Sequence, residues 1–165
     1  MFNDKNLDVV DEDVWSDIEI CKSGNLVGSS YLVSKILTEK SVLEFGKVNG
    51  LEVVSLVLPL VVGPFICPKI PSSVYLALAM IFGDEKRYEY LTNSYMVHTD
   101  DAISALIFLF ECDNANGSSK ETKNGDGKFT ELSSRKLLDS GFKFKYGVND
   151  MYDGAIQICK EKNIL

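Results

Sequence analysis

The sequence predicts an α/β fold, in which helices alternate with the strands of a parallel sheet. A long helical pattern covers residues 30–48, and Asn49-Gly50 follows it as a left-handed helix end. The next stretch, Leu51–Leu60, is mostly apolar, alternates little and is rich in β-branched residues. That composition is typical of a strand buried on both faces of a parallel sheet. A long helix followed by such a strand is half of a βαβ unit.

Composition excludes several classes of protein. With 165 residues, 45% of them hydrophobic, the chain is long enough for one domain with a real core. A net charge of −7 and scattered basic residues argue against a nucleic-acid surface. The longest apolar stretch, residues 53–66, is broken by two prolines and a glycine, so no membrane span is expected. The N-terminus has no secretory signal, and we expect a cytoplasmic protein.

The cysteines and the histidine encode neither a disulfide framework nor a metal site. The four cysteines lie far apart, without a CxxC pair, and read as reduced thiols. His98 is the only histidine, so a zinc role lacks partner ligands and a structural role is favoured. Trp15, the only tryptophan, is interpreted as a packing anchor in preference to a substrate wall.

The remaining elements follow in order along the chain. Acidic residues ahead of Val14 predict a short helix near residues 13–22, because carboxylates complement the exposed N–H groups of a first turn. Ser29 or Ser30 is expected to cap the helix of residues 30–48, whose apolar sector should form core. Residues 59–65 are expected to form a proline-rich turn and 72–82 a helix that Gly83 ends. Residues 97–101 are expected to form a strand end with an acidic cap for a helix at 102–110. A polar linker at 113–128 and two C-terminal helices at 133–141 and 150–162 complete the expected order.

Two places carry candidate chemistry. Tyr31 and Lys35 are four residues apart, so they share one face of the predicted helix, where a single carbonyl oxygen can meet both. A nearby ammonium favours the phenolate, which suits a general acid or base. The alternative is a packed ring beside a solvated amine. The proline-rich turn at residues 59–65 is expected at the carboxyl end of a strand, where open α/β sheets bind ligands.

Several motifs, taken in order, resemble the later part of an extended short-chain dehydrogenase/reductase. The similarity is greatest to the group of dihydroflavonol, vestitone and anthocyanidin reductases. It covers residues 11–111 and 133–165 and is carried by Tyr31-Leu-Val-Ser-Lys35, Leu43-Glu-Phe-Gly46, Asn49-Gly-Leu-Glu-Val-Val54, Val61-Val-Gly-Pro-Phe65, Met96-Val-His-Thr-Asp-Asp101 and Gly141-Phe-Lys-Phe-Lys-Tyr146.

The resemblance implies an NADPH-dependent reduction of a flavonoid-type or related carbonyl. It gives Tyr31 the roles of proton donor and cofactor contact, while Lys35 holds the nicotinamide ribose and lowers the tyrosine pKa. It also places Leu58, Pro59, Leu60 and Val61 at the nicotinamide end of NADP and makes Ser73 a further cofactor contact. A small-molecule substrate is implied, without nucleic acid and without a metal ion.

The chain also departs from that family. It contains no glycine-rich GxGxxG turn to bind the pyrophosphate. The family's catalytic serine would precede Tyr31 by more residues than this chain has, and a common tryptophan is Ser29 here. Between Glu111 and Ser133 the family carries a strand, a helix and substrate-lobe structure, where this chain has a polar segment.

These observations predict an incomplete NAD(P)-binding Rossmann-type fold with a shortened substrate lobe. We expect residues 1–112 to be the later part of the dinucleotide-binding domain with the start of the substrate lobe, 113–130 a polar linker and 131–165 the C-terminal substrate-lobe helices. One hypothesis is a truncated oxidoreductase of this family. The other is a catalytically inactive fragment or partner-binding remnant that self-associates through an exposed sheet edge. A binding module unrelated to reductases is a third reading, favoured only if the chain folds stably and ignores dinucleotides.

Overall fold

The computed structural model describes residues 9–10, 15–23, 28–91, 94–112, 131–132 and 134–165. The expected linker at residues 113–130 lies outside the described residues. The chain divides into two compact units, one of residues 1–55 with 114–140 and one of residues 56–113 with 141–165. Each unit is described by itself. No helix in the described ranges is long and apolar enough to cross a membrane.

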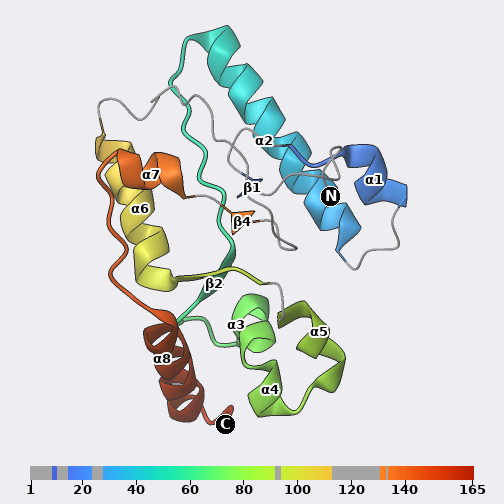
Figure 1. The fold of residues 1–165 in the computed structure, drawn as a ribbon, viewed down its shortest axis with the longest axis vertical. Coiled ribbons are helices and arrows are strands. Elements are labelled where there is room, and N and C mark those ends of the chain that lie inside the picture. Colours follow the sequence, from blue (N-terminus) through green and yellow to red (C-terminus); the bar gives the residue numbers. More distant parts are fainter. Residues whose placement is uncertain (1–8, 11–14, 24–27, 92–93, 113–130, 133) are drawn as a thin grey trace. The chain divides into compact units, whose positions relative to one another are not determined.

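The first unit is built around one long helix (Figure 1). Its elements are β1 (Val9–Val10), α1 (Ile18–Ser23), α2 (Ser29–Asn49), β4 (Glu131–Leu132) and α7 (Arg135–Asp139), and β1 pairs in parallel with β4. The predicted start of α1 near residue 13 is wrong. Asp17 caps the helix instead, because its Oδ1 accepts hydrogen bonds from the backbone N–H groups of Glu19 (2.7 Å) and Ile20 (3.2 Å).

Helix α2 has the predicted length but a different start. Gly28, with φ 84°, stands at its N-cap, so neither Ser29 nor Ser30 caps it. Its end is as predicted: Gly50 has φ 64°, and its N–H donates to the Gly46 carbonyl. The returning chain then packs on α2 so closely that a Cβ on Gly46 would lie 2.5 Å from Val53 Cγ2.

The expectation that the apolar sector of α2 forms core is wrong. Of its residues only Gly46 is buried, while Leu37 is 48% and Leu43 37% exposed. An apolar helix face of this kind packs against a covering layer, and in the described part of this unit the neighbours of α2 include α1, Trp15 and the segment after Gly50, which leave most of the face exposed.

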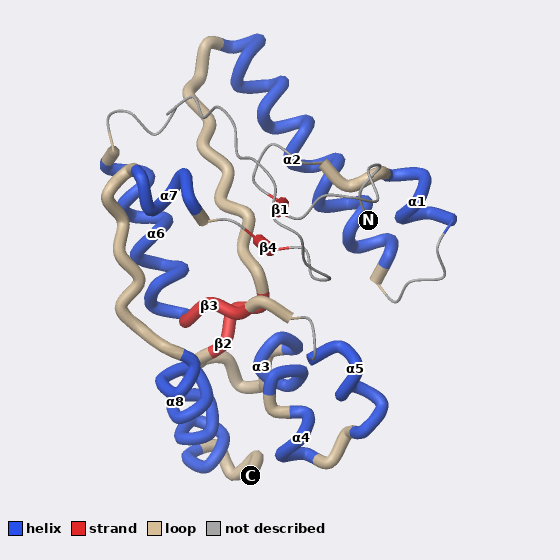
Figure 2. The backbone as a smooth tube through the Cα atoms, in the orientation of Figure 1, coloured by secondary structure: helices blue, strands red, loops and turns tan. Residues whose placement is uncertain are grey.

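The second unit consists of short helices around a two-stranded parallel sheet (Figure 2). Strand β2 (Leu60–Val62) pairs with β3 (Met96–His98), with Leu60 opposite Met96. The helices are α3 (Ser72–Ala77), α4 (Ala79–Phe82), the 3-10 turn η1 (Glu85–Arg87), α5 (Tyr88–Leu91), α6 (Thr99–Glu111) and α8 (Val148–Glu161). The predicted helix of residues 72–82 is therefore two helices joined at Leu78, and Gly83 ends the second with φ 68°.

The predicted strand at Leu51–Leu60 is wrong in position. Residues 51–59 form neither helix nor strand, and the strand begins at Leu60, inside the segment predicted as a turn. A strand exists only where a neighbour takes its backbone hydrogen bonds, and within residues 51–62 only 60–62 have such a neighbour. The turn itself follows at Gly63-Pro64.

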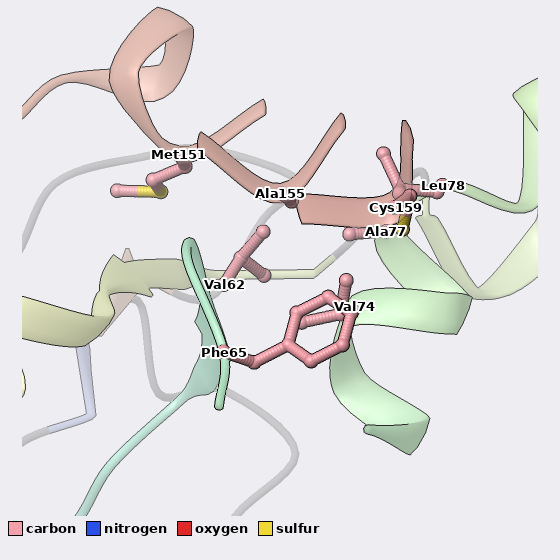
Figure 3. Packing of buried hydrophobic residues seen from close by; sticks show 8 residues of the cluster. All are labelled: Val62, Phe65, Val74, Ala77, Leu78, Met151, Ala155 and Cys159. Atoms are coloured by element: carbon pink, nitrogen blue, oxygen red, sulfur yellow. The ribbon is translucent and has the colours of Figure 1, made fainter. Parts of the chain in front are cut away.

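The core of this unit lies between α3, α8 and the sheet (Figure 3). Figure 3 shows Met151, Ala155 and Cys159 on one face of α8, turned toward Val62 and the side chains of α3. The full cluster is Val62, Phe65, Val74, Ala77, Leu78, Met151, Ala155 and Cys159. This amphipathic packing confirms the predicted C-terminal helix and fixes β2 from one side.

Asp101 joins two distant parts of the same unit. Its carboxylate is 1% exposed and accepts hydrogen bonds from the backbone N–H groups of Lys145 (3.1 Å) and Tyr146 (3.1 Å). The Tyr146 ring then stacks on His98 with centroids 4.0 Å apart. His98 Nδ1 accepts from the Asp100 N–H at 3.1 Å, so the favoured structural role of the histidine is that of helix cap. The predicted acidic cap is wrong, because α6 begins at Thr99 and both aspartates lie inside its first turn.

Gly154 is a close-packing position whose substitution we expect to destabilise the second unit. A Cβ there would lie 2.8 Å from both Cγ and Cδ of Pro64, a rigid ring. Gly154→Ala should lower the free energy of unfolding by about 1–2 kcal/mol despite the better helix propensity of alanine. In urea denaturation, Pro64→Ala combined with Gly154→Ala should lose less stability than the two single variants added together. Simple additivity would contradict this contact.

The cysteines offer a check on burial. All four are free; Cys21 and Cys159 are buried and Cys67 is exposed. Burial raises the pKa of the Cys159 thiol, which lowers its thiolate fraction further. Ellman's reagent should therefore label Cys67 rapidly in the native chain and reach Cys21 and Cys159 only after denaturant is added. Fast labelling of Cys159 in the native chain would contradict the packing of α8.

Candidate active site

Tyr31 and Lys35 lie together on the exposed side of α2, near its start. The Lys35 ammonium lies 5.6 Å from the centroid of the Tyr31 ring, within the range of a cation–π contact. Tyr31 is 64% exposed, and Lys35 is exposed as well. The predicted i, i+4 pair therefore exists as a contact between side chains.

The chemistry of this pair depends on its surroundings. A phenol beside an ammonium is a proton donor whose anion is stabilised by the cation. That stabilisation is weak in water and grows when a bound ligand or a protein wall excludes solvent. A shallow depression of about 390 Å³ adjoins the same end of α2 but does not include the pair; it is lined by Lys22, Ser29, Ser30, Val33, Ser34 and Leu37.

The other expected site residues lie in the second unit. Leu58 and Pro59 come directly before β2, and Leu60 and Val61 are its first two residues. Ser73, in the first turn of α3, donates its hydroxyl hydrogen to the Val61 carbonyl oxygen at 2.7 Å. The structure thus brings Ser73 to Val61.

One expectation about this segment needs correction. Because β2 ends at Val62, its carboxyl end is Gly63-Pro64, and residues 58–61 lie before and within the strand. Gly63 has φ 148°, and a Cβ there would lie 2.9 Å from Thr99 Oγ1. Only glycine fits this close approach of the turn to the start of α6.

Sequence reasoning missed two features near this segment. One is the Ser73–Val61 hydrogen bond, which no sequence pattern indicates. The other is the buried carboxylate of Asp101. The signal that could have found it is the pair Asp100-Asp101: one carboxylate suffices for the positive end of a helix, so the second was free for another role. In the described ranges, no group of three potential metal ligands comes together.

Known proteins resemble this chain over nearly its whole length. No family model matches the sequence. Vestitone reductase from Medicago sativa is 40% identical over 193 aligned residues, covering 99% of this chain and 59% of that protein. Dihydroflavonol 4-reductase from Hordeum vulgare is 38% identical, covering 94% of this chain and 52% of that protein. The crystal structure of alfalfa vestitone reductase matches with a TM-score of 0.82 and 37% identity, over 99% of this chain and 62% of that one.

The chain belongs to the vestitone and dihydroflavonol reductase group. It has part of the group's Rossmann-type α/β fold, so the fold class predicted from the sequence is confirmed. It spans between half and two thirds of the length of these relatives. The vestitone reductase alignment has 193 positions although this chain has 165 residues, so that relative carries residues inside the matched range that this chain lacks.

Proposed function

We propose that this chain is the C-terminal part of an NADPH-dependent reductase that acts on a flavonoid-type or related carbonyl, within the extended short-chain dehydrogenases/reductases. The observation that carries the proposal is the contact of Tyr31 with Lys35, in a chain 40% identical to vestitone reductase over 99% of its residues. In reaction terms it is an oxidoreductase acting on a CH–OH group with NAD or NADP as acceptor.

The proposal assigns contacts with the nicotinamide end of NADPH to each unit separately. In the first unit, Lys35 offers an ammonium for the ribose. In the second unit, the segment Leu58–Val61, to which Ser73 is hydrogen-bonded, offers an apolar strand start for the ring. When bound, NADPH supplies a hydride. These 165 residues contain no glycine-rich turn for the pyrophosphate. The proposal therefore expects this chain to bind NADPH through its nicotinamide end, and more weakly than a chain that also binds the pyrophosphate.

The proton chemistry belongs to the Tyr31–Lys35 pair. The carbonyl carbon of the substrate gains a hydride, and its oxygen takes the proton of the Tyr31 phenol, so a C–H and an O–H bond form while the carbonyl π bond breaks. The phenolate left on Tyr31 is stabilised by the Lys35 ammonium, whose Nζ lies 5.6 Å from the ring. Water then returns a proton to Tyr31.

The second candidate is a catalytically inactive remnant that binds a partner. It is favoured by exposed apolar side chains on two long helices, such as Phe45 (60% exposed) on α2 and Phe110 (91% exposed) on α6. Apolar side chains mark an interaction surface where they form a contiguous exposed patch, so this candidate requires such a patch on α2 or on α6. Self-association through an open sheet edge and a cytoplasmic location, both expected from the sequence, belong to this proposal as well.

Calorimetric titration of the purified chain with NADPH, paired with a far-UV circular dichroism melt, separates the two candidates. A truncated but competent reductase should show saturable binding, a cooperative melt, and NADPH oxidation with vestitone or a dihydroflavonol. A cooperative melt without NADPH binding would favour the partner-binding remnant and contradict the reductase proposal.

A further inference from the structure

Strand β2 has one edge that β3 does not satisfy. The Leu60 N–H donates to the Tyr95 carbonyl at 3.1 Å, so the peptide groups of Leu60 face β3. In a parallel ladder, alternate residues bond to the same neighbour. The peptide groups of Val61 therefore face the opposite edge, where its half-buried carbonyl has no donor in β3 and needs another one.

Ser73 is that donor. Its Oγ lies 2.7 Å from the Val61 carbonyl oxygen, and the residue is half-buried. The adjacent Val74 is 2% exposed and packs in the core, which fixes the first turn of α3. A hydroxyl has one hydrogen, and this one is used for Val61, so Ser73 can accept but not donate a further hydrogen bond.

The backbone around Val61 has few other restraints. Pro59 has no N–H to contribute, β2 is three residues long, and Gly63 with φ 148° ends it. One additional hydrogen bond is therefore a large share of what holds residues 58–61 in place.

We propose that Ser73 is a positioning residue: by binding the Val61 carbonyl it holds the Leu58–Val61 backbone in the conformation in which it receives the nicotinamide end of the cofactor. The part of this inference that concerns NADPH rests on the proposed function; the part that concerns the backbone does not. Ser73 acts through Val61, because its own hydroxyl hydrogen faces the strand.

Three variants of the full 165-residue chain test the inference. Ser73→Ala removes the donor, Ser73→Thr keeps a hydroxyl at the same position, and Ser72→Ala alters the exposed neighbour in the same helical turn. Amide hydrogen exchange at Leu60 and Val62 should speed up about fivefold in Ser73→Ala, the effect of losing one hydrogen bond. It should stay near the parent rate in Ser73→Thr and in Ser72→Ala.

The NADPH dissociation constant is the second readout. Ser73→Ala should weaken binding several-fold, Ser73→Thr should restore it, and Ser72→Ala should leave it unchanged. Unchanged exchange at Leu60 and Val62 in Ser73→Ala, or a Ser73→Thr variant that behaves like Ser73→Ala, would overturn the inference. If the parent chain does not bind NADPH, the proposed function fails, and the exchange rates still decide whether Ser73 holds the strand.

Discussion

Asp101→Ala is expected to lower the free energy of unfolding of the second unit by about 3 kcal/mol, because it removes a buried carboxylate that accepts hydrogen bonds from two backbone N–H groups. The carboxylate is 1% exposed and receives the N–H groups of Lys145 and Tyr146 at 3.1 Å each. These bonds attach the chain that leads into α8 to the first turn of α6, so their loss should also reduce the amide exchange protection of α8.

Asp100→Ala is the matched control. Asp100 is the neighbouring carboxylate in the same first turn of α6, and its side chain is 55% exposed. Its replacement removes only an exposed interaction with the helix N-terminus, about 0.3–1 kcal/mol. Both free energies come from urea denaturation followed by circular dichroism. If the Asp101 variant were no less stable than the Asp100 variant, the buried carboxylate would not be the attachment point of α8.

Local signals in the sequence predicted where helices end better than where they begin. Gly50 and Gly83 end helices with positive φ at the residues expected, because a left-handed helix end depends on only a few adjacent residues. The strand was misplaced because a strand depends on a pairing partner far away in the sequence. Residues 51–59 have the composition of a buried strand, but a strand needs a partner, and β3 meets the chain only from Leu60 onward.

The interactions at the candidate site also fall into two groups, those that local sequence predicts and those that depend on tertiary packing. The Tyr31–Lys35 contact follows from helical spacing alone and was predictable. The bonds of Ser73 to Val61, 12 residues apart, and of Asp101 to Lys145, 44 residues apart, depend on tertiary packing. No residue type or spacing marked the Ser73–Val61 bond beforehand, and the pair Asp100-Asp101 marked a second carboxylate without indicating its partners. The exposed apolar sector of α2 shows the same limit. Periodicity predicts which face of a helix is apolar, but it does not predict which part of the protein packs against that face.

Tyr31→Phe is expected to reduce turnover about 10²- to 10⁴-fold, the usual contribution of a positioned proton donor. The substitution removes the phenol oxygen and keeps the ring over which the Lys35 ammonium lies at 5.6 Å. Cofactor affinity should therefore stay close to that of the parent chain, so the loss should appear in kcat and not in the NADPH dissociation constant. Steady-state NADPH oxidation with vestitone, alongside calorimetric titration, measures both quantities.

Tyr90→Phe controls for the loss of an exposed phenol as such. Tyr90 is 44% exposed and lies in α5 of the second unit, outside the proposed site. Its variant should turn over at the parent rate. If Tyr31→Phe retained the parent kcat, the proton would have to come from another group, and the Tyr31–Lys35 pair would be a solvated cation–π contact on an exposed helix. If kcat and NADPH affinity fell together with a lower melting temperature, the ring would matter for folding, and the proton-donor role would lose its support.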